Sequence, residues 1–286
     1  MLDVGEIDAW EEASFEPATL NFWRRSAETY ARHRNPFLEA ELGTNLESFA
    51  VDWLHSLSLG PINKFLARFC MQLFTLNCWR AGPAVSSSQE RLHTHGVQCL
   101  KADLFAWYAD EQRRGILHTR VQNLTDTMFT ENHINFHGSE CNHFLKFCLC
   151  LWDRYHELIP NAASWLRGLR ALDCMLDVCH NAGDWSVSEQ DVQNFCEAVM
   201  ILNRQFVSLD ISGIPKNHFL IELAINMLHQ GSPKNTGCWH DEAANKILKG
   251  VGTRSGVHRR HWALRTLDDF RHLHVVGGAV RAGANA

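Results

Sequence analysis

Alternating runs of β-branched residues bounded by turns, the pattern that half-buried β-strands produce, are nearly absent from this sequence of 286 residues. Apolar residues instead recur at intervals of three and four, which is typical of helices with one buried face. The sequence therefore predicts a mainly α fold, a multi-helix bundle or array of about ten helices with no substantial β-sheet. Within boundary errors of about three residues, we expect helices at 18–34, 45–57, 61–80, 97–114, 118–133, 139–158, 161–181, 188–208, 216–230, 239–250 and 258–273.

Signals for secretion and for membrane insertion are also lacking. The first residues include neither a basic nor an apolar segment of the signal-peptide type. The longest apolar run, around Phe144 to Trp152, is interrupted by Lys146 and is too short to span a bilayer. The ten cysteines contain no Cys-x-x-Cys pair. These absences predict reduced thiols, a nuclear or cytoplasmic location and no membrane partner.

Several catalytic signatures are missing as well, because the chain has no Gly-x-Ser-x-Gly, no Gly-rich phosphate loop and no dinucleotide-binding fingerprint. Its net charge of −5 argues against attraction of nucleic acid over the whole surface. A local basic face is still possible late in the chain, from Lys246, Lys249, Arg254, Arg259, Arg260 and Arg265. Large aromatic residues at helical spacing are expected in the core, namely Trp107, Trp152, Trp165, Trp185 and Phe195.

Loop-forming residues divide the chain. The clearest loop is the Gly/Pro/Ser segment at 82–88, and the next is at 231–237. We expect an N-terminal helical segment at 1–48, an all-helical domain at 49–275 and a disordered, Gly/Ala-rich tail at 276–286.

Acid-x-x-His pairs are more frequent than chance predicts, six against roughly two for random placement. The pairs are Asp52/His55, Glu90/His93, Glu140/His143, Asp153/His156, Asp177/His180 and Asp269/His272. This spacing places a carboxylate and an imidazole one helical turn apart, as in carboxylate-bridged di-metal centres, for which Glu90/His93 and Glu140/His143 are the candidates. The alternative is ordinary ion pairing along helices.

A denser group of potential ligands is formed by His133, His137, Glu140, Cys141 and His143. Nitrogen and sulfur ligands suit zinc, although no second paired arm with finger-like spacing follows. The alternatives for these histidines are exposure to solvent or capping of the core.

Glu242 is the single most suggestive acid. Trp239, Ala243 and Ile247 can pack one face of its helix, which places Glu242 at the border between the apolar and polar faces, after a loop. The alternative is that Glu242 merely favours the positive end of the helix dipole.

Four segments together resemble the C-terminal half of cut-and-paste DNA transposases with an RNase H-like catalytic domain, in the CACTA and hAT groups. They are Asp52-Trp53-Leu54-His55-Ser56-Leu57-Ser58-Leu59, Gly138-Ser139-Glu140-Cys141-Asn142-His143, Pro215 to His218, and Gly231-Ser232-Pro233 followed by Trp239 and Glu242. In those families an Asp-x-x-His or Cys-x-x-His motif precedes a long all-helical insertion, and the last catalytic acid follows it. The chain departs from the pattern where Glu222 occupies the position of a common second histidine.

The resemblance implies that Glu242 is the remnant third catalytic acid, which would help to hold Mg²⁺ or Mn²⁺ for attack on a DNA phosphodiester. Asp52 and His55 would be the motif beside it, and Lys246, Lys249, Arg254, Arg259 and Arg260 would contact DNA. The two preceding acids of the family lie on strands, which the first 48 residues do not predict. We therefore expect a transposase-derived protein that does not cut DNA alone; the alternatives are a helical zinc or di-iron protein and a scaffold that binds other protein chains.

The transposase interpretation makes a geometric prediction. The segments that begin at Asp52 and lead to Glu242 flank the helical excursion, so they should return to one neighbourhood, whereas a simple helical array would leave them apart.

Overall fold

A computed structural model describes residues 51–82, 85, 88–214 and 216–238, all of which belong to one unit that begins at Val51. Its long elements are the π-helical segment η4 (Leu54–Ile62) and the helices α3 (Asn63–Thr75), α5 (Gln89–Arg113), α6 (Gly138–Tyr155), α7 (Ala162–Asn181), α8 (Glu189–Ser208) and α9 (Lys216–His229). Short 3-10 turns lie at η5 (Asp126–Met128), η6 (His156–Leu158) and η7 (Pro233–Asn235). No strand occurs among the described residues, where the mainly α prediction is confirmed; the helices expected at 18–34, 239–250 and 258–273 lie outside them.

Local capping residues set several of the helix boundaries. The Ser188 hydroxyl accepts a hydrogen bond from Asp191 N at 3.1 Å, as expected for an N-cap, and α8 begins at the next residue. At the start of α6, the Glu140 carboxylate accepts a hydrogen bond from His137 N at 2.8 Å. These side chains satisfy backbone N–H groups that the first helical turn leaves without partners.

The helix expected at 118–133 is wrong. Between Arg114 and His137 the chain is mostly irregular, with only the short turn η5, and α5 occupies 89–113 instead of 97–114. The backbone of this segment bonds to side chains of other elements: Asn63 binds both the N–H and the carbonyl of Ile134, and the Tyr108 hydroxyl accepts from Val121 N. These backbone groups therefore bond to side chains of other helices and not to one another as they would in a helix.

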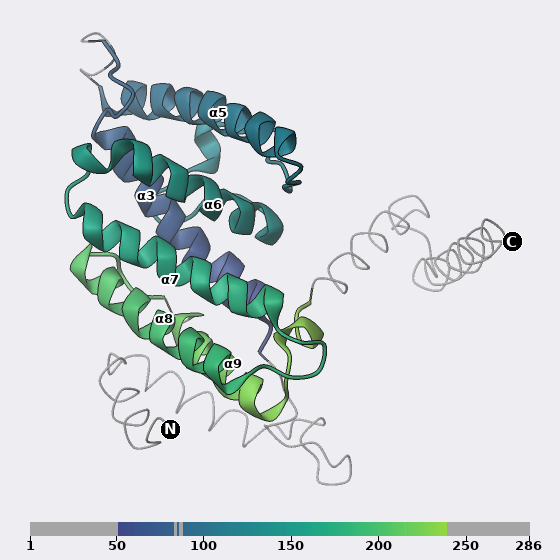
Figure 1. The fold of residues 1–286 in the computed structure, drawn as a ribbon. Coiled ribbons are helices and arrows are strands. Elements are labelled where there is room, and N and C mark those ends of the chain that lie inside the picture. Colours follow the sequence, from purple (N-terminus) through teal and green to yellow (C-terminus); the bar gives the residue numbers. More distant parts are fainter. Residues whose placement is uncertain (1–50, 83–84, 86–87, 215, 239–286) are drawn as a thin grey trace, which may run out of the picture. The chain divides into compact units, whose positions relative to one another are not determined.

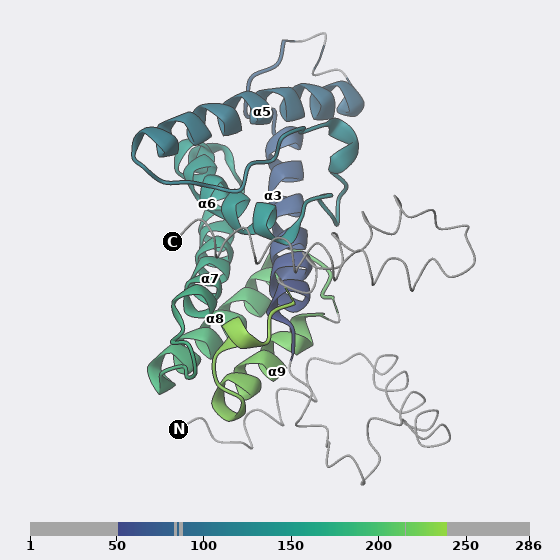
Figure 2. The same ribbon diagram turned by 90° about the vertical axis from the view of Figure 1, so that its right-hand side faces the viewer.

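The helices pack in a simple order (Figure 1). α6, α7 and α8 lie side by side, and α3 crosses behind them. α5 packs against α3 at one end, while α9 packs against α8 and η4 at the other (Figure 2). None of the helices in the described ranges is both long and apolar enough to cross a membrane.

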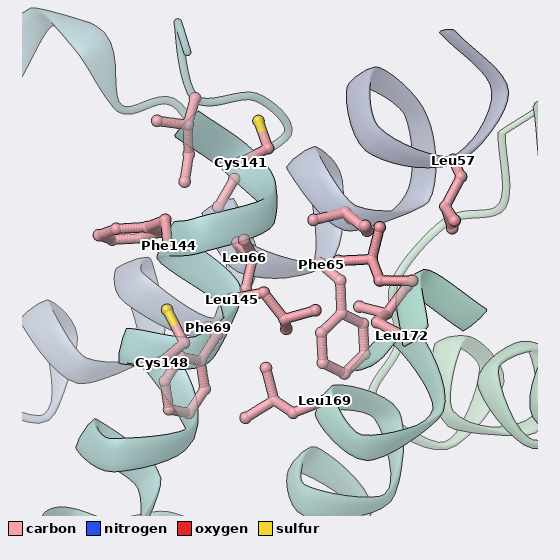
Figure 3. Close-up of a cluster of buried hydrophobic side chains, with 14 of the residues drawn as sticks. Leu57, Phe65, Leu66, Phe69, Cys141, Phe144, Leu145, Cys148, Leu169 and Leu172 are labelled. Carbon is pink, nitrogen blue, oxygen red and sulfur yellow. The ribbon is translucent and has the colours of Figure 1, made fainter. Parts of the chain in front are cut away.

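The centre of the core is formed where α3 meets α6 and α7 (Figure 3). Phe65 and Phe69 of α3, Phe144 of α6 and Leu169 of α7 are all fully buried. The Phe65 ring lies directly over Gly168, so that a Cβ at this glycine would be 2.2 Å from Phe65 Cζ. Gly168 therefore allows α7 and α3 to approach closely.

The aromatic residues expected in the core divide into two groups. Trp165 and Phe195 are buried, and Trp107 and Trp152 pack partly buried against the core, as predicted. Trp185, in contrast, is 85% exposed in the connection between α7 and α8, so its assignment to the core was wrong. The ten cysteines all lie within the described residues, and no disulfide joins any two of them there.

Candidate functional site

The candidate site lies where the two ends of the described unit meet. Val51 N donates a hydrogen bond to Asn226 Oδ1 at 2.6 Å, and Cys238 N donates to Asp52 Oδ1 at 2.9 Å. The Thr236 hydroxyl also donates to the carbonyl of Val51 at 3.5 Å. The segment that starts the helical excursion is therefore hydrogen-bonded to the segment that ends it, across more than 170 residues. The distance from Asp52 to Glu242 itself lies outside the described residues.

Asp52 links this junction to the start of η4. Its Oδ1 also accepts a hydrogen bond from Leu54 N at 3.0 Å, and its Oδ2 accepts from His55 N at 3.3 Å and pairs with His55 Nδ1. The Ser56 hydroxyl donates to the Asp52 carbonyl at 2.6 Å. Asp52 thus caps the first turn of η4 and, with the same carboxylate, holds the backbone of Cys238.

The electrostatics of Asp52 follow from these contacts. Burial would by itself raise the pKa of Asp52, but the hydrogen bonds from Cys238 N, His55 and Leu54 N lower it by more, and the net shift is downward. The side chain is 16% exposed, whereas that of His55 is 48% exposed. The His55 imidazole is therefore exposed to solvent, whereas the Asp52 carboxylate behind it accepts hydrogen bonds within the protein.

The buried Trp53 packs at the junction against the ring of His180, an exposed residue at the end of α7. Trp53 is 4% exposed, and its ring meets that of His180 edge-to-face at 5.3 Å between centroids. Burial lowers the pKa of His180, and nearby Lys146 acts in the same direction, whereas Asp177 opposes it. The start of η4 therefore packs against the end of α7 as well as against the segment around Cys238.

Helix α9 runs along η4 in the opposite direction. Lys216 Nζ donates to the Leu59 carbonyl at 3.2 Å near the start of α9, and Asn226 binds Val51 near its end. Between these two contacts lie the pair His218/Glu222 on α9 and the pair Asp52/His55 at the start of η4. His218 Nε2 is 3.4 Å from Glu222 Oε1 and lowers the pKa of Glu222 by its hydrogen bond, against the opposing effect of burial.

The residues predicted as zinc ligands have separate environments. The Cys141 thiol accepts a hydrogen bond from Asn63 Nδ2 at 3.4 Å, and burial raises its pKa to about 12. His143 Nδ1 accepts from Thr119 N at 2.9 Å, and Glu140 caps α6. His133 and His137 are exposed.

Within the part of the chain that the structure describes, no three His, Cys, Asp or Glu side chains are grouped so that they could hold a metal ion. The ring of His93 packs against Phe74 at 5.3 Å, whereas His143 contacts the ring of His118 at 5.1 Å. The di-metal pairing of Glu90/His93 with Glu140/His143 therefore has no ligand cluster among the described residues.

The other predicted site residues lie outside the described residues. They are the acid Glu242 and the basic residues Lys246, Lys249, Arg254, Arg259 and Arg260. Their roles in metal and DNA binding remain predictions.

The sequence did not reveal a polar cluster that fastens the segment after α5. His118 Nε2 is 3.1 Å from Glu111 Oε2, and the His118 ring stacks on Trp107 at 4.4 Å. Burial, together with the neighbouring His118 and His180, lowers the pKa of His143 beside this cluster. Because Glu111 and His118 are seven residues apart across a helix end, no regular spacing could have predicted their contact.

Comparisons of this chain with protein-family models, with curated proteins and with solved structures find no match.

Proposed function

We propose that this chain is a transposase-derived helical protein that binds DNA and does not cut DNA by itself. The observation that carries the proposal is the hydrogen bond from Cys238 N to Asp52 Oδ1, 2.9 Å long. It joins the Asp-x-x-His turn to the segment that leads to Glu242, in the arrangement that the transposase interpretation requires and that a simple helical array would lack.

The short sequence separation between Cys238 and Glu242 also supports the proposal. Glu242 follows Cys238 by four positions in the sequence, and an extended chain of four residues spans at most about 14 Å. In this proposal Glu242 therefore lies near the Asp52/His55 pair.

The contacts of Asp52 support the absence of cutting. Metal-dependent strand cleavage needs several carboxylates that converge on the metal ions. Both oxygens of Asp52 already accept hydrogen bonds, from Cys238 N and Leu54 N on one side and from His55 on the other. In this proposal Asp52 positions the chain and does not serve as a metal-binding acid beside Glu242.

DNA cleavage tests the catalytic half of the proposal. The purified chain incubated with supercoiled DNA and Mg²⁺ or Mn²⁺ should show no nicking above that of the Glu242→Ala variant. Metal-dependent nicking that this variant abolishes would overturn the proposal.

Salt-dependent binding tests the other half. Duplex DNA should bind with an affinity that falls steeply with salt, since each phosphate contact contributes about 0.9 to the slope of log K against log salt concentration. Lys246→Gln combined with Lys249→Gln should reduce that slope by about 2. Lys101→Gln, which removes one positive charge from α5, is the control and should change the slope little. DNA binding that is absent or insensitive to salt would contradict the proposal.

A further inference from the structure

The turn that follows α5 exposes two aliphatic side chains beside three arginines. Ile116 is 45% exposed and Leu117 is 81% exposed. Between residues 112 and 125 the sequence contains three arginines and neither Asp nor Glu. Residues 113–120, named the α5 tip below, are therefore both apolar and basic. Adjacent exposed apolar side chains with a polar rim are a feature of interaction sites.

The backbone holds Leu117 outward. Gly115 ends α5 in the left-handed conformation, at φ 80°, and Ile116 N donates to the Glu111 carbonyl at 2.9 Å. On the other side of Leu117, His118 Nε2 is 3.1 Å from Glu111 Oε2. Both neighbours of Leu117 are thus bound to one residue of α5, so the exposure of Leu117 follows from fixed contacts of the chain on either side of it.

The three arginines converge on the end of α5. Arg113 is the last residue of the helix, and Arg114 follows it. The Arg120 guanidinium donates to Gln112 Oε1 at 2.6 Å, which brings the third positive charge back to the same helix end. The side chains of Arg113 and Arg114 are 76% and 72% exposed. Because each guanidinium carries five N–H donors, donors remain for a ligand.

Helix stability alone does not account for this arrangement. Arg113 pairs with Asp110 and Arg114 pairs with Glu111, and the dipole of a helix favours cations at its C-terminus. Such exposed ion pairs contribute little to stability. Neither effect requires Arg120 at the same place or two aliphatic side chains in water. A polyanion that also accepts an apolar side chain matches both features of the α5 tip.

The α5 tip lies on the side of the described unit where α5 ends, α6 begins and α7 ends (Figure 1). Thr119 N donates to His143 Nδ1 at 2.9 Å, which fixes the tip to the start of α6. His180 at the end of α7 acts electrostatically on His143, and its ring contacts that of Trp53 beside the junction. DNA at the α5 tip therefore lies on the side of the junction, from which the chain continues past Cys238.

We propose that the α5 tip inserts Leu117 into the minor groove of duplex DNA while its three arginines contact the flanking phosphates. Proteins that bind in this way insert apolar side chains between base steps and kink the duplex by about 20–90°. They use Arg, Asn and Gln beside the inserted residue, and Gln122 and Asn123 are exposed directly after the α5 tip. The inference rests on the DNA binding proposed above and adds a second contact, on described residues.

Bending of DNA by the full chain tests the insertion of Leu117. When the wild-type chain binds a short duplex with a donor dye and an acceptor dye at its ends, energy transfer should increase because the ends approach. Leu117→Ala should leave the bound duplex nearly straight and weaken binding about tenfold, because one aliphatic side chain is no longer buried. Leu117 is mostly exposed in the free chain, so the variant should keep the fold, which circular dichroism checks. Leu158→Ala, 48% exposed beyond the other end of α6, is the control and should bend DNA like the wild type.

Salt dependence tests the arginines separately. Arg113→Gln and Arg120→Gln should each lower the slope of log K against log salt concentration by about 0.9, because each loses one phosphate contact. Arg204→Gln, which changes an exposed arginine of α8, should leave the slope as in the wild type. Unchanged slopes in both variants of the α5 tip would contradict the phosphate contacts.

The outcomes separate this inference from the proposed function. Equal bending by the wild type and Leu117→Ala, or a straight duplex in the wild-type complex, would overturn the insertion and leave DNA binding intact. Bending that persists in Lys246→Gln combined with Lys249→Gln would support the insertion even if the contacts proposed after residue 238 fail. A wild-type chain that binds no DNA would overturn both proposals. Binding to vesicles of phosphatidylserine and phosphatidylcholine that Leu117→Ala abolishes, without any bending of DNA, would assign the α5 tip to a membrane surface and overturn the inference.

Discussion

The contact between Phe65 and Gly168 leaves no room for a methyl group. Gly168→Ala places a Cβ 2.2 Å from Phe65 Cζ in a fully buried region. We expect a loss of about 2 kcal/mol in the free energy of unfolding, because overpacking outweighs the gain in helix propensity of about 1 kcal/mol. Urea denaturation measures the change. Phe65→Leu should restore part of the stability of Gly168→Ala, since the two changes share one contact; a Gly168→Ala chain as stable as the wild type would contradict the packing.

The Asp52 carboxylate accepts hydrogen bonds both from the first turn of η4 and from Cys238 N, and two substitutions test these bonds. Asp52→Ala removes both the cap of η4 and the link to Cys238, and should cost about 2 kcal/mol of stability. Asp52→Asn keeps an Oδ1 for Leu54 N and Cys238 N, and should cost less. Hydrogen exchange measures the link directly, because the Cys238 amide should exchange faster in Asp52→Ala than in Asp52→Asn.

Asp153→Ala is the matched control for Asp52. Asp153 belongs to the same kind of acid-x-x-His pair but is exposed, and His156 contacts its backbone carbonyl rather than its carboxylate. The substitution should leave Cys238 exchange unchanged. Equal acceleration of Cys238 exchange by Asp52→Ala and Asp153→Ala would refute the role assigned to Asp52.

At the residue scale, spacing predicted some local contacts and no distant ones. Three-residue spacing correctly indicated that Asp52 and His55 would meet, because a helical turn brings such residues together. The partners Asn226 and Cys238 lie 175 and 186 residues from the residues that they bind. Single hydrogen bonds at such separations leave no periodic pattern in a sequence.

At the scale of elements, the segment between α5 and α6 depends on one buried amide. Asn63 is 1% exposed; its Oδ1 accepts from Ile134 N at 2.9 Å and its Nδ2 donates to the Ile134 carbonyl at 2.6 Å. Asn63→Ala leaves the buried Ile134 N without its partner, whereas the Ile134 carbonyl still accepts from Phe136 N, and the substitution should cost about 2 kcal/mol. Urea denaturation measures this loss, and hydrogen exchange should show the segment around Ile134 opening before the helices do.

Asn135→Ala provides the comparison for Asn63→Ala. Asn135 is exposed, and its contribution to the described structure is the backbone bond from its N–H to the Met128 carbonyl at 2.9 Å. We expect the free energy of unfolding of the Asn135→Ala chain to stay within about 0.5 kcal/mol of that of the wild type. If Asn63→Ala cost no more than Asn135→Ala, the segment would be held by apolar contacts alone.

Helices with local start signals were the easiest elements to predict. α7, α8 and α9 begin and end within about two residues of the expected boundaries, and Ser188 caps α8 as expected. The wrong helix at 118–133 has apolar residues at helical spacing, but its backbone N–H groups at Thr119 and Val121 donate to side chains of α6 and α5. Periodicity detects an apolar face and cannot detect that a distant side chain competes for the backbone.

At the scale of the whole molecule, the titratable groups define a range of pH in which the fold is most stable. The pKa values of Asp52 and Glu222 are lowered from 3.8 and 4.5, so their contributions are present above those values and lost as pH falls through the folded values. Burial lowers the pKa values of His143 and His180 from 6.5, so the unfolded chain binds protons first and stability falls as pH drops below about 6.5.

Thiols limit stability on the alkaline side. Burial raises the pKa of Cys78 from 9.0 to about 11 and that of Cys141 to about 12. The unfolded chain therefore loses these protons first, and stability should decline as pH rises above 9.0 towards 12. Urea denaturation as a function of pH should accordingly give a plateau between about 7 and 9, with a fall on each side.

Individual substitutions should each change one region of the dependence of stability on pH. His143→Gln and His180→Gln together should flatten the decline between pH 7 and 5, because the two imidazoles whose pKa values are lowered in the fold are then absent. Asp52→Asn should leave that region unchanged and reduce the further loss below pH 4, where the carboxylate would otherwise be protonated. The two regions differ because the pKa values involved differ. Protonation of the two histidines destabilises the fold near pH 6, whereas protonation of the Asp52 carboxylate removes its stabilising hydrogen bonds only below about pH 4. A decline between pH 7 and 5 that survives in the double histidine variant would show that protonation of these two rings does not destabilise the fold.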